Sequence, residues 1–459
     1  MNAWKRWSLV VLAIGPVFSQ LANEIDDVIE RPEFSGCLWG IKAERVGTTE
    51  VLYELNADLF FVPASNNKLL STFAAWNTFG PSYQFHTTLV PSADSSDRVV
   101  LCGAGDPSLT SLQVHEAVAS AVQGNPTLRG SNITVQIDAS RSEATELFPS
   151  SWEWGDLQYY YGAAPSAVVI DGNVMTVRVS PGASVADGAN VSVISVGAES
   201  CFGSIRNEVT TSDTSSLTSK FIIEAGTLVF YVTGSVAADS DPIDLTIACM
   251  DPLRRAAAVL THELEQNNVT VVPSSEEDLL VYGTKECFDN STVPLADIVS
   301  ESLAVLLNHT LLESDNTFAE EILRRQSIRG GYTDAITNVT ETLCLLGLNT
   351  SGFSIVDGSG LSRHDLIKPQ FLAALFTIAG QDFVDLLPLA GRTGTLATRF
   401  VGTPAEGKLR AKTGTESGVN ALSGRVNDVA FSILTNNCPQ PSSVVRTGID
   451  DIAVLFAEV

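Results

Sequence analysis

The chain has 459 residues and a mass of 48.8 kDa, which is more than one hydrophobic core comfortably supports, so its length predicts roughly two to three domains. Apolar residues make up 44% and charged residues 17%, a balance that is typical of a packed globular protein and excludes a disordered chain. The formal net charge of −26 repels phosphate backbones and anionic membranes, which argues against nucleic-acid binding but leaves room for a local basic pocket.

The N-terminus has the pattern of a secretory signal peptide, which we place at residues 1–22. Two basic residues precede an apolar run over residues 7–18, and the small residues Ser19 and Ala22 offer cleavage positions. The run is shorter than the roughly 20 apolar residues of a membrane-spanning helix, which favours a removed signal over the alternative of an uncleaved anchor, so we expect no stable membrane span. The sequence thus predicts a secreted or extracytoplasmic protein, which uses a secretory pathway or, in a bacterium, enters the periplasm.

The elements that follow fall into three groups. Residues 36–43 and 51–61 have the pattern of two strands joined by a turn at Gly47, and a helix is predicted over residues 64–79. Between residues 81 and 293, short runs rich in Val, Ile and Thr are broken by Gly, Asp and Ser, which predicts a mostly β region. The clearest of these runs are residues 133–137, 174–179 and 221–232.

Helical periodicity returns beyond residue 294, and strand-like runs follow it. The predicted helices are residues 295–312, 317–325 and 370–379, and the predicted strands are residues 408–413, 419–425 and 429–434. Helices and antiparallel strands therefore frame a β-rich centre. We expect one domain made of residues 23–80 and 294–459, interrupted by an inserted β-rich segment over residues 81–293.

The cysteines and the glycosylation sequons give information about the cellular compartment of the protein. Seven cysteines without a C-x-x-C pair argue against a tight zinc site, and their odd number leaves at least one unpaired within the chain. Their pairing stays open, with buried free thiols as the ordinary alternative. Asn-x-Ser/Thr sequons are in modest excess, which favours a glycoprotein of a eukaryotic secretory route, with chance as the alternative. They begin at Asn132, Asn190, Asn268, Asn290, Asn308, Asn338 and Asn349.

The first chemical motif is S-x-x-K, formed by Ser65 and Lys68 at the start of a predicted helix. Pro63 precedes that helix, so the serine falls in its first turn and shares a face with the lysine. A serine hydroxyl is a poor nucleophile until a neighbouring base takes its proton, and a lysine serves as that base when burial or a second cation lowers its pKa. Lys412 is the candidate cation. For this motif alone, a helix cap with a surface charge is the alternative.

The second motif, S-x-N, consists of Ser314, Asp315 and Asn316 between two helical runs. Thr317 and Glu320 form a T-x-x-E capping box that predicts the start of the second helix. Taken alone, the motif has an Asx turn as its alternative.

The third motif, Lys412-Thr413-Gly414, ends a strand-like run, where glycine permits a ligand to approach the backbone closely. A hairpin turn is the alternative for this motif alone. The three motifs, however, follow one another in a fixed order on a helix, an inter-helix turn and a strand, which argues against coincidence. The chain lacks H-E-x-x-H, G-x-S-x-G and the phosphate-binding glycine motifs, so we expect neither a metal nor a cofactor.

This constellation resembles the serine penicillin-binding proteins and β-lactamases. The 249 residues from Ser65 to Ser314 far exceed what a compact β-lactamase needs. They match a domain-sized insertion, as in the D-alanyl-D-alanine carboxypeptidases of the PBP4 (DacB) type, peptidase family S13. Further stretches similar to that family are residues 63–70, 103–107, 152–167, 357–363 and 394–396 with Arg399.

The resemblance implies an α+β fold of the β-lactamase/transpeptidase-like type, an antiparallel sheet flanked by helices, with a large β-rich insertion domain. The catalytic domain would then be residues 23–80 and 294–459. The implied enzyme is a serine-type D-Ala-D-Ala carboxypeptidase, with endopeptidase action on cross-links as a second activity of the same site. Its implied partners are a D-Ala-D-Ala-terminated peptide or peptidoglycan fragment and β-lactams as covalent inhibitors.

Carried over residue by residue, the resemblance implies that Ser65 attacks the carbonyl between two terminal D-alanines, with Lys68 as the general base. An acyl-enzyme forms, Ser314 relays a proton to the leaving amine, and Asn316 holds the substrate amide. Water then releases the acyl group from the serine.

The strand residues would bind the other end of the substrate. Lys412 and Thr413 are expected to bind the terminal carboxylate, and Gly414 and Thr415 to complete the substrate-binding strand. Backbone N–H groups of Ser65 and Thr415 would form the oxyanion hole, where each donor is typically worth about 3 kcal/mol to the transition state.

Asp156 and Arg363 are candidates for side-chain specificity. The resemblance implies that they suit the amine and the carboxylate of a stem-peptide side chain. For Asp156 the alternative is a turn residue, and for Arg363 it is a structural salt bridge. Two other functions stay open: a β-lactamase-related serine hydrolase, which the large insertion argues against, and a catalytically inactive binding homologue, which the intact motifs argue against.

Overall fold

The computed structural model describes residues 16–48, 50–92, 95, 97–140, 148–282, 287 and 292–459. The described residues form two compact units. The first unit comprises those up to Asn66 together with Ser351–Ser354 and Leu366–Val459, and the second comprises Asn67–Thr350 and Ile355–Asp365. The predicted insertion of residues 81–293 lies wholly in the second unit, and its boundaries stay a prediction.

The first unit is built on a five-stranded antiparallel sheet with the strand order β17-β18-β19-β1-β2. Its strands are β1 (Leu38–Arg45), β2 (Val51–Leu55), β17 (Arg410–Glu416), β18 (Val419–Val426) and β19 (Val429–Asn436). The first and last parts of the chain thus pair along β1 and β19. This sheet confirms the strands predicted on both sides of the inserted segment, although β2 ends earlier than expected.

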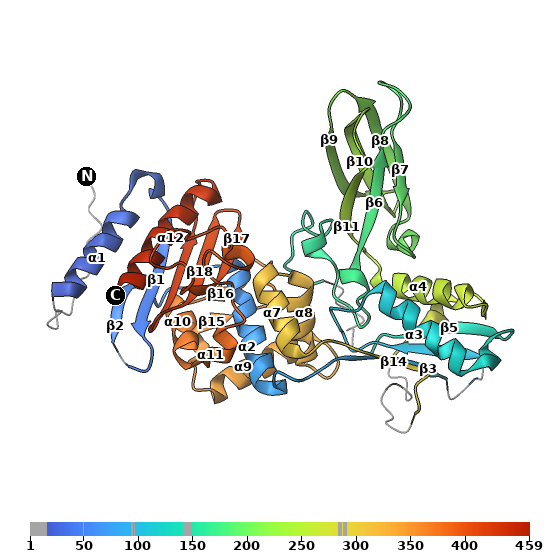
Figure 1. Ribbon diagram of the computed structural model, residues 1–459, viewed down its shortest axis with the longest axis horizontal. Helices are drawn as coiled ribbons and strands as arrows, with labels where there is room; N and C mark the ends of the chain where they lie inside the picture. Colours follow the sequence, from blue (N-terminus) through green and yellow to red (C-terminus); the bar gives the residue numbers. More distant parts are fainter. Residues whose placement is uncertain are drawn as a thin grey trace. The chain divides into compact units, whose positions relative to one another are not determined.

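Helices cover both faces of this sheet (Figure 1). On β1, Trp39, Ile41 and Ala43 share a buried core with α1 (Pro16–Ile29) and α12 (Ser442–Glu458). The alternate residue Gly40 faces the other way, where a Cβ would lie 2.4 Å from the ring of Phe61 and 2.8 Å from the first residue of α10 (Pro369–Ile378). The period of two along the strand therefore assigns one face to each layer of helices.

A disulfide between Cys37 and Cys438 joins the chain just before β1 to the chain just after β19. The predicted signal peptide overlaps this unit. Its residues 1–15 lie outside the described residues, and both proposed cleavage positions fall within α1, where Leu21 is buried. Cleavage after Ser19 keeps that buried contact, whereas cleavage after Ala22 removes it, and the signal peptide stays a prediction.

The second unit contains four helices that pack together: α2 (Lys68–Phe79), α7 (Leu303–Glu313), α8 (Asn316–Arg325) and α9 (Tyr332–Leu345). Helix α2 is buried along most of its length, and it contacts each of the other three. The predicted helix over residues 295–312 is partly wrong, because its beginning forms a strand, β14 (Ala296–Val299).

A six-stranded sheet follows in the same unit, with β13 beside β5 and the main order β12-β5-β4-β3-β14. Its strands are β3 (His86–Pro91), β4 (Arg98–Cys102), β5 (Asn132–Asp138), β12 (Thr270–Val271), β13 (Leu280–Val281) and β14. Helices α3 (Ser111–Gly124) and α4 (Pro252–Gln266) share an apolar core with these strands. The expectation of a mostly β region missed both helices. A second disulfide joins Cys102 to Cys287.

The second unit also contains two three-stranded sheets, with orders β11-β6-β7 and β8-β10-β9, which Figure 1 shows in green. Their strands are β6 (Val174–Ser180), β7 (Asn190–Val193), β8 (Ser204–Ser212), β9 (Ser216–Glu224), β10 (Thr227–Ala237) and β11 (Ile243–Ala248). Alternating residues of both sheets form one apolar core. The run predicted over residues 221–232 is a hairpin, which turns at Ala225 and Gly226.

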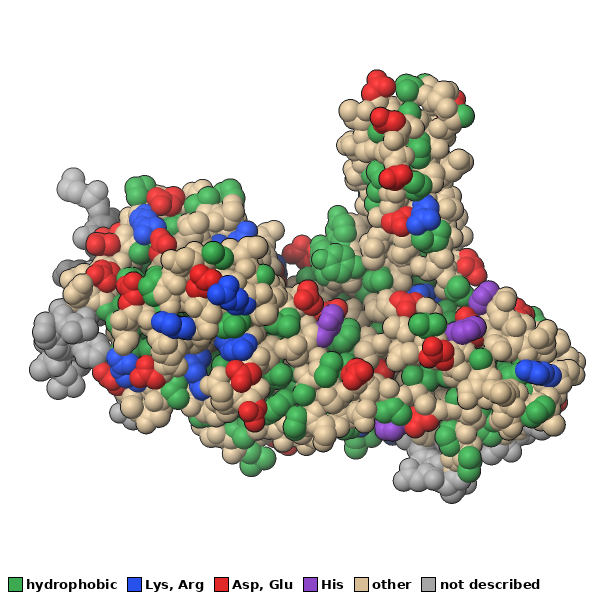
Figure 2. All heavy atoms as spheres, in the orientation of Figure 1, with side chains coloured by type: hydrophobic (Ala, Val, Ile, Leu, Met, Phe, Trp, Pro, Cys, Tyr) green, Lys and Arg blue, Asp and Glu red, His purple; other side chains and the backbone are tan. Residues whose placement is uncertain are grey.

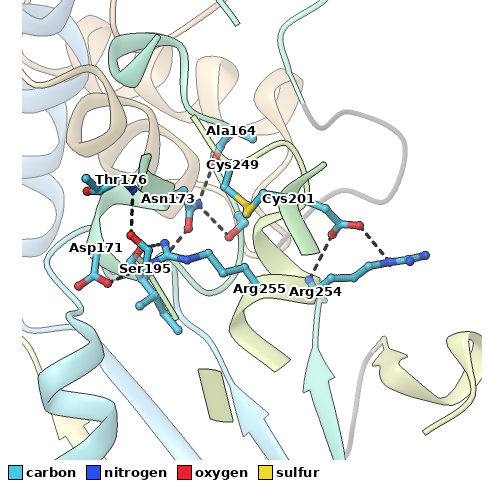
Figure 3. The surroundings of a disulfide bond; sticks show 12 residues. Ala164, Asp171, Asn173, Thr176, Ser195, Cys201, Cys249, Arg254 and Arg255 are labelled. Carbon is cyan, nitrogen blue, oxygen red and sulfur yellow. Dashed lines mark hydrogen bonds and ion pairs between the residues drawn. A yellow bond between two sulfur atoms is a disulfide. The ribbon is translucent and has the colours of Figure 1, made fainter. Parts of the chain in front are cut away.

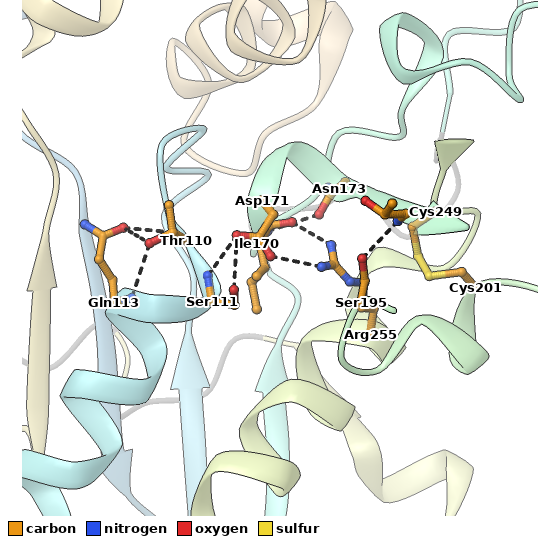
Figure 4. A network of polar contacts seen from close by, with 11 residues as sticks. Thr110, Ser111, Gln113, Ile170, Asp171, Asn173, Ser195, Cys201, Cys249 and Arg255 are labelled. Carbon is orange, nitrogen blue, oxygen red and sulfur yellow. Dashed lines mark hydrogen bonds and ion pairs between the residues drawn. A yellow bond between two sulfur atoms is a disulfide. The ribbon is translucent and has the colours of Figure 1, made fainter. Parts of the chain in front are cut away.

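An ion pair between the buried Arg255 and the half-buried Asp171 lies next to the start of β6 (Figures 3 and 4). Arg255 of α4 donates to an Asp171 carboxylate oxygen at 3.0 Å and to the Ile170 carbonyl at 2.7 Å. The other Asp171 oxygen accepts the backbone N–H of Ser111, at the start of α3, at 2.9 Å. Beside this pair, the Cys201–Cys249 disulfide ties residues that are 48 positions apart. The side chain of Asp171 thus links α3 and α4 to the segment that leads into β6.

Charge is spread over the surface. On the face that Figure 2 draws, acidic and basic side chains are interspersed. Among the residues that the structure describes, no helix combines the length and the apolar character needed to cross a bilayer.

Candidate active site

The segment that carries Ser65 is a short 3-10 helix, Ala64–Asn67, which continues directly into α2. Ala64 is fully buried and has a φ of +46°, a left-handed backbone that is rare for a residue with a Cβ. The buried Asn66 donates from Nδ2 to the Lys412 carbonyl at 3.0 Å. In the first unit, the serine segment is therefore anchored to the K-T-G strand.

The K-T-G strand, β17, packs closely against this segment. A Cβ at Gly414 would lie 2.7 Å from the Pro63 carbonyl oxygen and 3.2 Å from the Cβ of Ala64, so only glycine fits there without displacing the serine segment. Lys412 is fully buried, and its Nζ donates to the Thr413 carbonyl at 2.9 Å.

The remaining residues of this strand are more accessible. The Thr413 hydroxyl donates to Thr395 Oγ1 at 2.9 Å, which links the motif to the stretch around residues 394–396, and Thr415 is exposed. The hydroxyl of Thr413, which is predicted to bind a carboxylate, is thus held by a second hydroxyl. Arg399, from the same family-like stretch, pairs with Asp450 of α12 and supports the fold.

In the second unit, Lys68 is fully buried at the start of α2. Its Nζ donates to Asn316 Oδ1 at 2.6 Å and to the Ser359 carbonyl at 2.7 Å. Asn316 donates in turn from Nδ2 to the Tyr161 carbonyl at 2.8 Å, which orients the amide so that its oxygen faces the lysine. One Nδ2 hydrogen remains for other partners. The structure thus brings the predicted base and the predicted amide-binding asparagine into direct contact.

Ser314 and Asp315 form the turn between α7 and α8. Ser314 ends α7 with a φ of +61°, a second left-handed backbone within a motif. Asp315 caps α8 by accepting the N–H of Phe318 at 3.1 Å. The predicted T-x-x-E capping box is therefore wrong: Thr317 is the second residue of α8, and Glu320 is buried against the loop of residues 357–363.

The loop of residues 357–363 is organised by Asp357, which is fully buried. Its carboxylate accepts the N–H of Gly360 and of Ser362, each at 2.7 Å, and Trp152 Nε1 at 2.9 Å. Asn67, next to Lys68, donates to the same carboxylate and to the Asp357 carbonyl. Trp152 is thus a packing residue, whereas Trp154 is 54% exposed.

A cavity of about 870 Å³ adjoins Ser314 and Asn316 within the second unit. Its wall includes the aromatic side chains of Tyr160, Tyr161 and Phe318 and the imidazole of His309. A hydrogen bond to Asp315 raises the pKa of His309, partly offset by burial. The S-x-N turn therefore borders a cavity that is large enough for a small molecule.

Asp156 and Arg363 differ in their burial and in their hydrogen bonds. Asp156 is half-buried and accepts the Tyr161 hydroxyl at 3.3 Å, so it lies beside the residue whose carbonyl holds Asn316. Burial raises the pKa of Tyr161 to about 12, with further contributions from Asp156. Burial also raises the pKa of Asp156. Arg363 is exposed on its loop.

The predicted site residues therefore divide between the two units. Those of the first unit are Ser65, Lys412, Thr413, Gly414 and Thr415, and those of the second are Lys68, Ser314, Asn316, Asp156 and Arg363. Sequence reasoning missed the residues that hold these groups, namely Asn66, Asn67, Tyr161, Asp357, Ser359 and Glu320. For five of them the signal in the sequence was their position in the family-like stretches, and Glu320 was noticed only through the T-x-x-E pattern, which predicted a different role. No group of metal-binding side chains occurs in the described part of the chain.

Comparisons with known proteins agree with this arrangement. The model of the D-Ala-D-Ala carboxypeptidase 3 (S13) family matches residues 21–459. The D-alanyl-D-alanine carboxypeptidase of Actinomadura sp. strain R39 is 31% identical, over 97% of this chain and 86% of that protein. Penicillin-sensitive carboxypeptidase A of Dictyostelium discoideum is 29% identical, over 95% of this chain and 91% of that protein.

Solved structures show the same fold. Penicillin binding protein 4 of Haemophilus influenzae superposes with a TM-score of 0.78 at 21% identity, covering 95% of this chain and 98% of that one. The same protein complexed with a β-lactam gives a TM-score of 0.74. The expected α+β fold is confirmed, and the chain belongs to the D-Ala-D-Ala carboxypeptidase (S13) family of serine-type hydrolases.

Proposed function

We propose that Ser65 is the nucleophile of a D-Ala-D-Ala carboxypeptidase and that Lys68 is its general base. The contact of the buried Lys68 Nζ with Asn316 Oδ1 and the Ser359 carbonyl is the observation that carries the proposal. A neutral amine has two N–H donors and one lone pair. The two N–H groups can donate to Asn316 Oδ1 and the Ser359 carbonyl, and the lone pair can accept the proton of Ser65, three residues earlier in the chain.

The reaction would proceed by acyl transfer. As the Ser65 hydroxyl loses its proton to Lys68, a bond forms from Oγ to the carbonyl carbon between the two D-alanines. The C–N bond then breaks, and Ser314 relays a proton to the departing D-alanine amine. Water attacks the ester in the second half of the reaction and restores the serine.

The K-T-G strand would bind the substrate carboxylate. Lys412 supplies a cation and Thr413 a hydroxyl, while the small Gly414 lets the serine segment lie against the strand. The backbone N–H groups of Ser65 and Thr415 would stabilise the oxyanion. Asp156 and Arg363 are proposed to bind the polar ends of a stem-peptide side chain. The site accepts a β-lactam in the same orientation, because the lactam amide mimics D-Ala-D-Ala.

An extracytoplasmic location is part of this proposal. Three disulfides join six of the seven cysteines, a pattern that forms and persists in oxidising compartments. Asn290 lies outside the described residues, and Asn308 is half-buried within α7. The exposed sequon asparagines, which are the candidate glycosylation sites, are Asn132, Asn190, Asn268, Asn338 and Asn349. Asn338 donates from Nδ2 to the Gln326 carbonyl, and a glycan on that nitrogen would leave it a single hydrogen for this bond.

Incubation of the purified chain with labelled benzylpenicillin, followed by mass spectrometry, tests the proposal. A stable adduct of one penicillin per chain, lost in Ser65→Ala and Lys68→Ala, is the expected result. Rapid turnover of the drug would favour a β-lactamase-related hydrolase, and no adduct would indicate an inactive binding homologue. Release of D-alanine from a diacyl-D-Ala-D-Ala peptide then establishes the substrate class, and cleavage of a cross-linked peptide tests the endopeptidase activity.

A further inference from the structure

We propose that Glu320 is a positioning residue for Lys68: its carboxylate holds the backbone of Gly358 and Ser359 so that the Ser359 carbonyl meets the lysine Nζ. This inference rests on the proposed role of Lys68 as the base. All four residues belong to the second unit.

Ser359 joins the two side chains through its backbone. Its N–H donates to Glu320 Oε1 at 2.7 Å, and its carbonyl accepts Lys68 Nζ at 2.7 Å. The N–H of Gly358 also reaches the Glu320 carboxylate, at 3.0 and 3.1 Å. Two consecutive peptide N–H groups on one buried carboxylate fix the path of the backbone that carries the lysine's acceptor.

Helix α8 supplies both the asparagine that contacts the lysine and the glutamate that holds the loop carrying its other acceptor. Asn316 contacts Lys68 directly, and Glu320 follows it by four residues on α8, so both point from one face of the helix. The loop lies tightly on that helix, since a Cβ at Gly358 would be 2.6 Å from the Ala319 carbonyl and 2.9 Å from the Cβ of Leu323. Helix α8 therefore positions Lys68 in two ways: directly through the side-chain amide of Asn316, and indirectly through the loop that Glu320 holds.

Asp357 and Glu320 hold different parts of the loop of residues 357–363. Asp357 already accepts the N–H groups of Gly360 and Ser362, so the second half of the loop is held without Glu320. Glu320 holds the first half, and its fully buried carboxylate lies near the negative charge of Asp357. Burial is the main cause that raises the pKa of Glu320 to about 7, and Asp357 adds to it.

The neighbouring Glu321 provides a matched control. It is equally buried on α8, burial raises its pKa to about 7 as well, and its carboxylate accepts the N–H of Ser166 at 2.7 Å. Ser166 belongs to a different loop from Ser359. The two glutamates thus share burial and helix, and they hold different loops. Glu321 also pairs with the buried Arg324 at 3.5 Å, a contact that Glu321→Gln removes as well.

The test compares Glu320→Gln with Glu321→Gln at pH 8, where both carboxyl groups of the wild type are ionised. Single-turnover acylation by benzylpenicillin separates the acylation rate constant from the affinity of the preceding complex. We expect Glu320→Gln to lower the rate constant by at least about 10-fold with the affinity within about 3-fold, because a displaced base slows the chemical step. Glu321→Gln should leave both values within about 3-fold of wild type.

The inference is overturned if Glu320→Gln acylates at the wild-type rate, loses no more than Glu321→Gln, or loses affinity alone. If Glu320→Gln does not fold, Glu320→Asp, which keeps the charge but is one methylene shorter, is judged by the same two values. Lys68→Ala separates the two proposals. If that variant still acylates, the assignment of the base has failed; if it does not acylate while Glu320→Gln does, only the positioning role has failed.

Discussion

The contact between Asn316 and Lys68 gives the sharpest prediction about catalysis. Replacing Asn316 by Asp keeps an oxygen 2.6 Å from the lysine Nζ but gives it a negative charge. It also puts a carboxylate oxygen where the amide donates to the Tyr161 carbonyl at 2.8 Å. The variant therefore favours the ammonium form of a lysine that must be neutral to accept the serine proton.

The size of the effect follows from the geometry. An opposite charge within about 4–6 Å typically shifts a pKa by 1–3 units, and Lys68 is fully buried, so solvent screens the pair poorly. We expect the limb of the pH–rate profile on which acylation rises with pH to move upward by roughly 1–3 units. At neutral pH this corresponds to a loss of roughly 10- to 1000-fold, which should be recovered at alkaline pH.

Single-turnover acylation by benzylpenicillin, measured across pH, checks this outcome. Asn316→Ala is the control, because it removes the acceptor without adding a charge, and it should lower the rate at every pH without an alkaline shift. A profile for Asn316→Asp that overlays the wild type, or that falls evenly at every pH, would refute the assignment of Lys68 as the base held by this contact.

Gly414→Ala should slow acylation by at least about 10-fold, since its methyl group would displace the serine segment, and a wild-type rate would contradict this. Serine at both Cys201 and Cys249 should cost ~4 kcal/mol in urea unfolding, the chain-entropy value for their 48-residue separation. The pKa of Glu321 is raised from 4.5 to about 7, so its contribution to the free energy of unfolding is fully present below pH 4.5. About 3 kcal/mol of that free energy is lost as the pH rises through 7. Glu321→Gln should therefore flatten the measured pH–stability curve in this range. Maleimide should label one thiol, Cys344, in the native chain.

Much of the fold could be predicted from the sequence where the signal is local. The strands of the first unit are short strand-like runs and α2 carries apolar residues at helical spacing, so most of them, β2 apart, were expected close to their observed bounds. The three motifs mark the site because each occupies a short stretch of chain. Helices α3 and α4 were missed because the surrounding Val- and Thr-rich runs favoured a uniform β interpretation of residues 81–293.

Long-range contacts explain what could not be predicted at the site. The sequence pattern T-x-x-E suggested that Glu320 caps its own helix, but Asp315 takes the cap and the glutamate accepts N–H groups from a loop 38 positions later. Asp357 binds Trp152, which is 205 positions away. No local pattern specifies which loop lies on a given helix face, so the residues that support the motifs become visible only in three dimensions.

The Cys37–Cys438 bond, which spans 401 positions, turns most of this polypeptide into a covalent ring. A protease that cuts any exposed loop within the ring opens it without releasing a fragment, so the severed pieces remain one molecule until a reductant arrives. A chain cleaved once within the ring should therefore still migrate at full mass on a non-reducing gel.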